Sequence, residues 1–305
     1  MAEMDTIGFI GIGKIGLPIC AHLIKAGYRV LGYSRRAVTE FENSGGTPAR
    51  SPEQIGAQAN FVFACLPSDQ ALEEVMRGAD GLICTAHPGQ IVVGLGSHPI
   101  RVKQRYIAPL ADKGAIFLDG EVSGTPGMVA ERKGVIYLGG DREAVNKIES
   151  VIGAFADHML YLGPFGAATK VKLINNLLVG LHIAGAAQAM AIGLRADINP
   201  ELLIEAIATG SGGSTQFRIR APWMAERRLT PQQGSGPGLA RNLESAKELA
   251  NEVGVATPLL DCLIDIYRQA VPSIGERDVA AILEFFESQP QGRARRLAAE
   301  KEQHS

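Results

Sequence analysis

Lys172 and Asn176 are the residues whose types and spacing could do chemistry in this chain. In a helix each residue turns by roughly 100°, so positions four apart lie on one face, one above the other. An ammonium group can donate a proton, and a carboxamide can hold an oxygen atom in place. The pair could therefore protonate or deprotonate an alcohol. The alternative is a lysine at a helix start that pairs with a surface carboxylate. The nearby Lys170 should face away, about 200° round the helix.

A glycine-rich loop near the start of the chain predicts a phosphate-binding turn. Gly11, Gly13 and Gly16 follow the apolar run 6–10 and open a helical segment. Gly11 would permit the tight turn, Gly13 would let the backbone approach a pyrophosphate, and Gly16 would let the helix pack closely on the strand. The helix N-terminus would offer free N–H groups to the phosphates. The strand–turn–helix context favours a dinucleotide site over an ordinary turn, formed by Gly11, Ile12, Gly13, Lys14, Ile15 and Gly16.

The residues after the second predicted strand, 29–33, indicate which dinucleotide binds. An NAD site usually has Asp or Glu there for the ribose hydroxyls, but this chain has Ser34, Arg35 and Arg36. Two guanidiniums and a hydroxyl could bind a 2′-phosphate, and a charge-assisted hydrogen bond contributes about 1.5–3 kcal/mol. We therefore expect NADP as the cofactor, with NAD possible. The alternative is two solvated arginines in a loop.

The order of apolar runs predicts an α/β fold of two domains. The first half alternates nearly continuous apolar runs with helical stretches, which is typical of a doubly wound, mostly parallel sheet of the Rossmann type. The predicted strands are 6–10, 29–33, 61–65, 91–95, 116–118, 135–138 and 159–162. After residue 166 all segments read as helices, beginning with a long one at 167–195. We expect an NADP-binding domain at 1–165, an all-helical substrate and oligomerisation domain at 166–290, and a charged, frayed tail at 291–305.

Composition excludes several classes of function. The chain has 305 residues, a net charge of -2 and a pI near 6.3, with no basic patch for nucleic acid or an anionic membrane. The run 173–194 has no charged residue and is long enough to span a bilayer, but its polar groups favour the buried spine of a soluble protein. Four cysteines match no metal or redox motif, and no histidines share ligand spacing. We expect a cytoplasmic protein without a metal site.

Four blocks in order resemble the β-hydroxyacid dehydrogenases, the family that includes 3-hydroxyisobutyrate dehydrogenase and tartronate semialdehyde reductase. The resemblance extends from residue 7 to about residue 287, and the second half is similar to the C-terminal domain of 6-phosphogluconate dehydrogenase. The blocks are the glycine loop at 8–16, Cys65-Leu66-Pro67-Ser68, the run Asp119-Gly120-Glu121-Val122-Ser123-Gly124-Thr125-Pro126-Gly127, and the lysine segment at 163–176.

The resemblance implies a role for each matching residue. Lys172 would be the catalytic acid–base group and Asn176 its orienting partner. The substrate carboxylate would be held by Ser123 and the backbone of Gly124, with Thr125 and Asn175 beside them. The cofactor would also be contacted by four residues outside the glycine loop and the arginines: Leu66, Pro67, Ser97 and Arg241.

Departures from the family pattern lie around the substrate and the nicotinamide. Gly96-Ser97-His98 stands where the family usually has a Ser-Thr pair, and Arg241-Asn242 stands where it tends to have Lys-Asp. Ser97 could still donate a hydroxyl near the nicotinamide ribose. His98 could touch the substrate, although we expect a solvated loop histidine. The far end of the substrate would meet the segment 211–220, which contains Ser214, Gln216, Arg218 and Arg220.

The expected activity is therefore reversible hydride transfer between NADP(H) and a small, carboxylate-bearing 3-hydroxy acid or aldehyde acid. Two alternatives remain: an NADPH-dependent imine reductase, which usually lacks the catalytic lysine, and a catalytically silent NADP-binding protein. The long apolar helix and the family resemblance also predict a homodimer or homotetramer.

Overall fold

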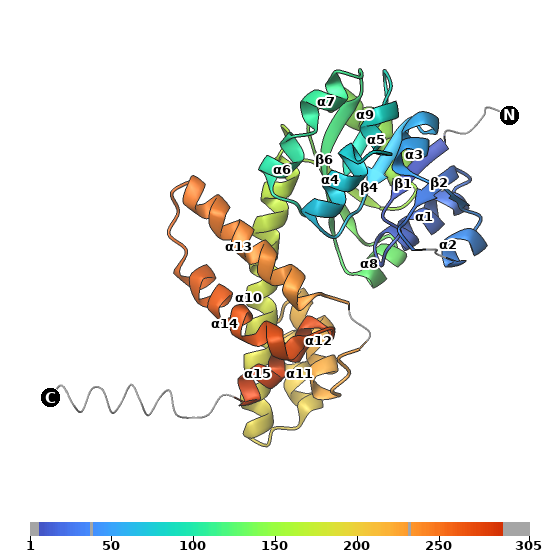
Figure 1. Cartoon of the computed structure of the whole chain (residues 1–305). Coiled ribbons are helices and arrows are strands. Elements are labelled where there is room, and N and C mark those ends of the chain that lie inside the picture. Colours follow the sequence, from blue (N-terminus) through green and yellow to red (C-terminus); the bar gives the residue numbers. More distant parts are fainter. Residues whose placement is uncertain (1–5, 37–38, 231–232, 289–305) are drawn as a thin grey trace. The chain divides into compact units, whose positions relative to one another are not determined.

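The computed structural model describes residues 6–36, 39–230 and 233–288 (Figure 1). The predicted tail at 291–305 lies outside them. The chain divides into two compact units, residues 1–174 and 175–305. Helix α10 (Ala167–Arg195) belongs to both, since the boundary lies about two turns after its start.

The first unit is built on one eight-stranded sheet with the order β3-β2-β1-β4-β5-β6-β7-β8. All neighbouring pairs are parallel except β6 and β7, which are antiparallel. This confirms the predicted doubly wound, mostly parallel sheet. The strands are β1 (Thr6–Ile10), β2 (Arg29–Tyr33), β3 (Thr47–Pro48), β4 (Phe61–Ala64), β5 (Ile91–Gly94), β6 (Ile116–Ser123), β7 (Val135–Gly139) and β8 (His158–Tyr161).

Helices cover both faces of this sheet because successive strand residues point to opposite sides. Phe63 packs in one apolar cluster with α1 (Gly16–Lys25), α8 (Pro126–Ala130) and α9 (Arg142–Gly153), and α2 (Thr39–Asn43) adds Phe41 to it. Its neighbour Val62 packs in a second cluster on the opposite face. That cluster contains side chains from α3 (Pro52–Gln58), α4 (Asp69–Arg77), α5 (Leu82–Thr85), α6 (Ile100–Gln104) and α7 (Ile107–Ala111).

Strand β6 is five residues longer than its apolar pattern predicts. Residues 119–123 continue the strand because they pair antiparallel with β7, from Asp119 opposite Gly139 to Ser123 opposite Val135. The sequence Asp-Gly-Glu-Val-Ser has the polar character of a loop, so only the long-range pairing reveals it as strand. As a result, the side chains of Asp119 and Glu121 lie inside the first unit, 0% and 1% exposed.

The second unit is entirely helical in its described residues. After α10 it contains α11 (Pro200–Thr209), α12 (Thr215–Ala225), α13 (Gly236–Glu252), α14 (Pro258–Ile274), a short 3₁₀ helix (Val279–Ala281) and α15 (Ile282–Ser288). Its interior holds an ion pair, with Arg220 Nε 3.3 Å from Asp278 Oδ1 and both side chains buried. Arg220 also donates to Gln216. Arg220 is therefore engaged inside the helical unit, and the role of the segment 211–220 toward the substrate stays a prediction.

Helix α10 is long and apolar enough to cross a membrane by length and composition alone. In its most apolar 18-residue window, 44% of the residues are buried inside the chain. The core helix of a soluble protein meets the same criteria. We retain the soluble interpretation as a prediction.

Candidate functional site

The glycine loop between β1 and α1 has the geometry that its pattern predicts. Gly11 has a φ of +98°, and a Cβ atom there would lie 2.1 Å from the carbonyl oxygen of Cys65. Its N–H donates to the carbonyl oxygen of Tyr33 at 2.9 Å. A Cβ at Gly16 would lie 2.2 Å from the carbonyl oxygen of Gly11. Only glycine fits these two positions, because backbone atoms fill the space that a side chain would need.

The middle glycine is different, because the space beside it is open. A Cβ at Gly13 would meet no atom within 4 Å. Helix α1 begins three residues later, and its N-cap residue Ile15 makes no side-chain hydrogen bond to the first N–H groups. Open space in front of uncapped N–H groups is what a pyrophosphate requires. The loop therefore fits a dinucleotide. Ile12 is 7% exposed and packs in the core, so its part in such a site would come from the backbone.

The predicted selectivity residues follow β2 directly. Ser34 is half-buried, whereas Arg35 and Arg36 are exposed. Neither guanidinium has an ion pair or hydrogen bond with the described part of the chain. Since β1 and β2 are parallel neighbours, the arginines lie at the same edge of the sheet as the glycine loop. The guanidinium groups of Arg35 and Arg36 are therefore available to bind an anion.

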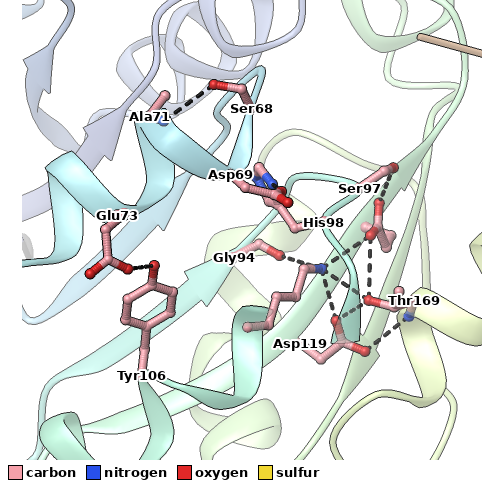
Figure 2. Close-up of polar contacts among 12 residues, drawn as sticks. Ser68, Asp69, Ala71, Glu73, Gly94, Ser97, His98, Tyr106, Asp119 and Thr169 are labelled. Atoms are coloured by element: carbon pink, nitrogen blue, oxygen red, sulfur yellow. Dashed lines mark hydrogen bonds and ion pairs between the residues drawn. The ribbon is translucent and has the colours of Figure 1, made fainter. Parts of the chain in front are cut away.

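The loops after β4 and β5 also lie at this edge, beyond the carboxyl ends of parallel strands, where α/β proteins bind ligands. Ser68 caps helix α4 by accepting from the Ala71 N–H at 3.2 Å. The two predicted cofactor contacts before it differ in exposure: Leu66 is half-buried and Pro67 is exposed. Ser97 is also exposed, and its hydroxyl donates to Glu121 Oε2 at 2.7 Å (Figure 2).

His98 is buried, which makes the expectation of a solvated loop histidine wrong. Its side chain is 4% exposed, and Nδ1 lies 2.8 Å from Asp69 Oδ1 (Figure 2). Gly96 makes room for the ring, since a Cβ there would lie 2.5 Å from His98 Nε2. Burial lowers the pKa of His98, and the hydrogen bond to Asp69 opposes this effect only in part. The imidazole is therefore neutral near physiological pH.

A buried lysine on helix α6 is the main feature that the sequence analysis missed. Lys103 is 0% exposed. Its Nζ atom lies near five oxygen atoms: Gly94 O (3.4 Å), Asp119 Oδ1 (2.9 Å), Gly120 O (3.1 Å), Glu121 Oε1 (3.0 Å) and Thr169 Oγ1 (3.0 Å). Two acidic residues at alternate positions of a buried strand require a cation. That requirement is the signal in the sequence that could have identified Lys103.

Lys103, Asp119, Glu121 and Thr169 form the Lys103 cluster. This cluster connects the first turn of helix α10 to strand β6. Asp119 Oδ2 accepts from the backbone N–H of Thr169 at 2.9 Å, and Asp119 Oδ1 accepts from the Thr169 hydroxyl at 2.6 Å (Figure 2). Asp119 thus satisfies a free N–H at the helix start, as a capping side chain does. Lys172 follows Thr169 by three residues, so one turn of helix separates it from this anchor.

Lys172, the predicted acid–base group, lies in the first unit near the start of helix α10. The residue is half-buried, and its amino group makes no hydrogen bond or ion pair with any part of the chain that the structure describes. Burial lowers the pKa of Lys172, while the charge of Glu121 raises it in part. Asn176 lies on the same helix and is 5% exposed, and its Nδ2 atom has no partner. Asn175 is half-buried.

The predicted substrate residues lie at the end of β6 and directly after it. Ser123 is the last residue of this strand and, like Gly124 and Thr125, is half-buried. The Thr125 hydroxyl accepts from the Met128 N–H at 3.3 Å and caps α8. Arg241 is exposed on α13 in the helical unit. The roles of these four residues toward ligands stay predictions.

Within residues 6–36, 39–230 and 233–288, no group of three or more His, Cys, Asp or Glu side chains could hold a metal ion. The four cysteines are free thiols. Cys20 is buried, and burial raises its pKa.

Two protein families match the two parts of the chain. Residues 6–163 match the NAD binding domain of 6-phosphogluconate dehydrogenase. Residues 166–286 match the family described as NAD-binding of NADP-dependent 3-hydroxyisobutyrate dehydrogenase. Together the matches cover nearly all described residues.

Individual relatives agree with these matches. L-threonate dehydrogenase of Cupriavidus necator is 34% identical over 229 residues, which is 74% of this chain and 77% of that protein. NAD-dependent L-serine dehydrogenase of Pseudomonas aeruginosa is 28% identical, covering 93% of this chain and 98% of that protein. The crystal structure of 3-hydroxyisobutyrate dehydrogenase from Salmonella typhimurium shares the fold, with a TM-score of 0.85 at 22% identity over 92% of this chain and 99% of that one.

Proposed function

We propose that this chain, which belongs to the 3-hydroxyisobutyrate dehydrogenase family of β-hydroxyacid dehydrogenases, transfers hydride reversibly between NADP(H) and a small 3-hydroxy acid. The observation that carries the proposal is the amino group of Lys172. It is sheltered, it lacks a partner in the described part of the chain, and its pKa is lowered. An amine in this state can both donate and accept a proton.

Lys172 is the group that moves the proton. In the reducing direction its ammonium form gives a proton to the aldehyde oxygen, so that an N–H bond breaks as the O–H bond forms. In the oxidising direction its neutral form takes the hydroxyl proton. A nicotinamide cofactor held by the glycine loop would supply or accept the hydride. Asn176 would orient the reacting oxygen, since its buried Nδ2 has a hydrogen bond to give.

The substrate carboxylate is assigned to Ser123 and the backbone of Gly124. A hydroxyl and an N–H beside it form charge-assisted hydrogen bonds to a carboxylate. The related enzymes named for L-threonate, L-serine and 3-hydroxyisobutyrate all take hydroxy acids by their names. These three acids are therefore the first substrates to test.

A substrate panel separates this proposal from its alternatives. Purified protein would be assayed with NADP and the three hydroxy acids, and with NADPH and aldehyde acids or cyclic imines, by absorbance of the reduced cofactor. Turnover of acids alone supports the proposal. Turnover of imines alone would favour the imine reductase. Cofactor binding with no turnover on any compound would favour the silent binding protein.

Cofactor selectivity gives a separate prediction. Replacing Arg35 or Arg36 with alanine should raise the KM for NADPH roughly ten- to hundredfold, because each change removes a charge-assisted hydrogen bond to the 2′-phosphate. The KM for NADH should stay unchanged. Steady-state kinetics with both cofactors measures this, and Lys147→Ala on helix α9 is a charge-matched control at another exposed position. Equal losses with both cofactors would contradict the assignment of NADP.

Assembly and location complete the proposal. The helical unit exposes several large apolar side chains, which supports a homodimer or homotetramer: Leu178, Ile192, Ile198, Leu202, Val253, Val255 and Leu259. The four free thiols support a reducing, cytoplasmic location.

A further inference from the structure

The buried cluster around Lys103 contains more negative than positive charge. It holds one ammonium group, from Lys103, and two carboxylates, from Asp119 and Glu121. All three side chains are at most 1% exposed. A buried charge is costly unless an opposite charge pairs with it. The cluster therefore has one carboxylate more than it has ammonium groups.

The hydrogen bonds agree with this count of charges. Each carboxyl oxygen has an N–H or O–H group beside it from which an ionised carboxylate can accept. Glu121 Oε1 accepts from Lys103 at 3.0 Å, and Oε2 accepts from the Ser97 hydroxyl at 2.7 Å. Burial alone would lower the pKa of Lys103, but the charges of Glu121 and Asp119 outweigh it, so its pKa is raised. Lys103 therefore stays an ammonium group, and Ser97 adds no charge.

Two other titratable groups near Glu121 do not supply the cation. Burial raises the pKa of the Cys65 thiol to about 12, with a further contribution from Glu121. Burial lowers the pKa of His98, whose Nδ1 is already bound to Asp69. Both groups are neutral near physiological pH, so neither adds a second positive charge beside Glu121.

Among the described residues, Lys172 is the candidate for this cation. Thr169 Oγ1 lies 3.5 Å from Glu121 Oε1, and Lys172 follows Thr169 by three residues on the same face of helix α10. The charge of Glu121 also raises the pKa of Lys172, against the effect of burial. We propose that Glu121 is a positioning residue: its carboxylate is the counter-ion of the Lys172 ammonium group, and Lys103 and Ser97 hold its two oxygens. This inference rests on the proposed role of Lys172 in proton transfer.

The pairing has a direct consequence for the chemistry. When Lys172 accepts the hydroxyl proton in the oxidising direction, the new ammonium group gains its counter-ion. When Lys172 gives up its proton in the reducing direction, the carboxylate of Glu121 loses the positive charge beside it. Glu121 therefore favours the protonated lysine in both directions, against the burial that favours the neutral amine.

The variant Glu121→Gln tests the charge without changing the shape. Its amide can accept from Lys103 and donate to Ser97, and it removes an excess buried charge, so the fold should persist. The pKa of Lys172 should then fall further. In profiles of kcat/KM against pH, the acid limb of hydroxy-acid oxidation and the alkaline limb of aldehyde reduction should both move to lower pH.

A direct titration gives a readout that needs no substrate or cofactor. Lysine amines carrying ¹³C-methyl groups can be followed by NMR, and the Lys172 resonance is the one missing in Lys172→Met. It should titrate at lower pH in Glu121→Gln than in the parent protein. In the parent protein itself, the Glu121 carboxyl ¹³C resonance should move as the Lys172 amine titrates, which requires no variant at Glu121.

Controls separate charge from structure. Glu121→Asp keeps the charge. Both limbs of the kcat/KM–pH profiles should therefore return toward their positions in the parent protein. Glu73→Gln, at a carboxylate that accepts from the Tyr106 hydroxyl at 2.5 Å, should leave both limbs and the titration unchanged (Figure 2). A lower rate in Glu121→Gln with unmoved limbs and an unmoved Lys172 titration would overturn the inference. Undiminished turnover of Lys172→Met would instead overturn the proposed function, and the titration would still decide whether Glu121 is the counter-ion of Lys172.

Discussion

Lys172→Met should lower kcat by about 10²–10⁴-fold in both directions, the usual contribution of a general acid or base. Methionine keeps the length and apolar stem of the side chain but cannot carry a proton. NADPH binding, followed by fluorescence titration, should be retained because the glycine loop is untouched. The variant should also lose the pH dependence of the parent enzyme. In that enzyme, oxidation should rise and reduction should fall as the pH increases through the lowered pKa of Lys172.

Lys170→Met is the matched control. Lys170 lies two residues earlier on the same helix and is exposed, so its loss should leave kcat and its pH profile as they are. Turnover of Lys172→Met at the parent rate, with cofactor bound, would exclude Lys172 as the acid–base group. An equal loss in both variants would indicate a general effect of the substitutions on the helix.

The parts of the site that sequence reasoning predicted are those with local causes. Gly11 and Gly16 are specified by a turn and a close approach between neighbouring elements, and the structure has both. The bounds of α10 agree with the predicted helix, since its apolar run is continuous and ends at Arg195. Short-range patterns of this kind are readable from one sequence because the interacting residues are close along the chain.

The parts that were missed depend on contacts between distant segments. Lys103 meets Asp119, Glu121 and Thr169, which lie 16, 18 and 66 residues away in the sequence. The burial of His98 depends on Asp69, 29 residues earlier, and on the space beside Gly96. Single-sequence patterns contain no record of such pairings. A polar stretch such as residues 119–123 therefore reads as a loop until its partner strand is known.

The Lys103 cluster leads to the largest expected effect on stability. Lys103→Met leaves Asp119 and Glu121 buried without their shared cation. Breaking a buried ion pair by removing one partner costs about 3–5 kcal/mol of unfolding free energy. For a unit of this size, the melting temperature should fall by about 6–20 °C. Differential scanning calorimetry or circular dichroism measures the change.

The pH dependence of this loss distinguishes charge from packing. Without Lys103 the two buried carboxylates repel each other, so protonation of one of them is favoured in the folded state and its pKa is raised above the unfolded value. By linkage, the folded variant binds more protons than the unfolded chain, and the stability deficit should shrink as the pH falls. A deficit that is equal at acidic and neutral pH would mean that lost packing, not unpaired charge, is the cause. Lys133→Met removes an exposed lysine paired with Glu131 at 2.7 Å, and it should leave the melting temperature close to that of the parent at every pH, because solvent screens that pair.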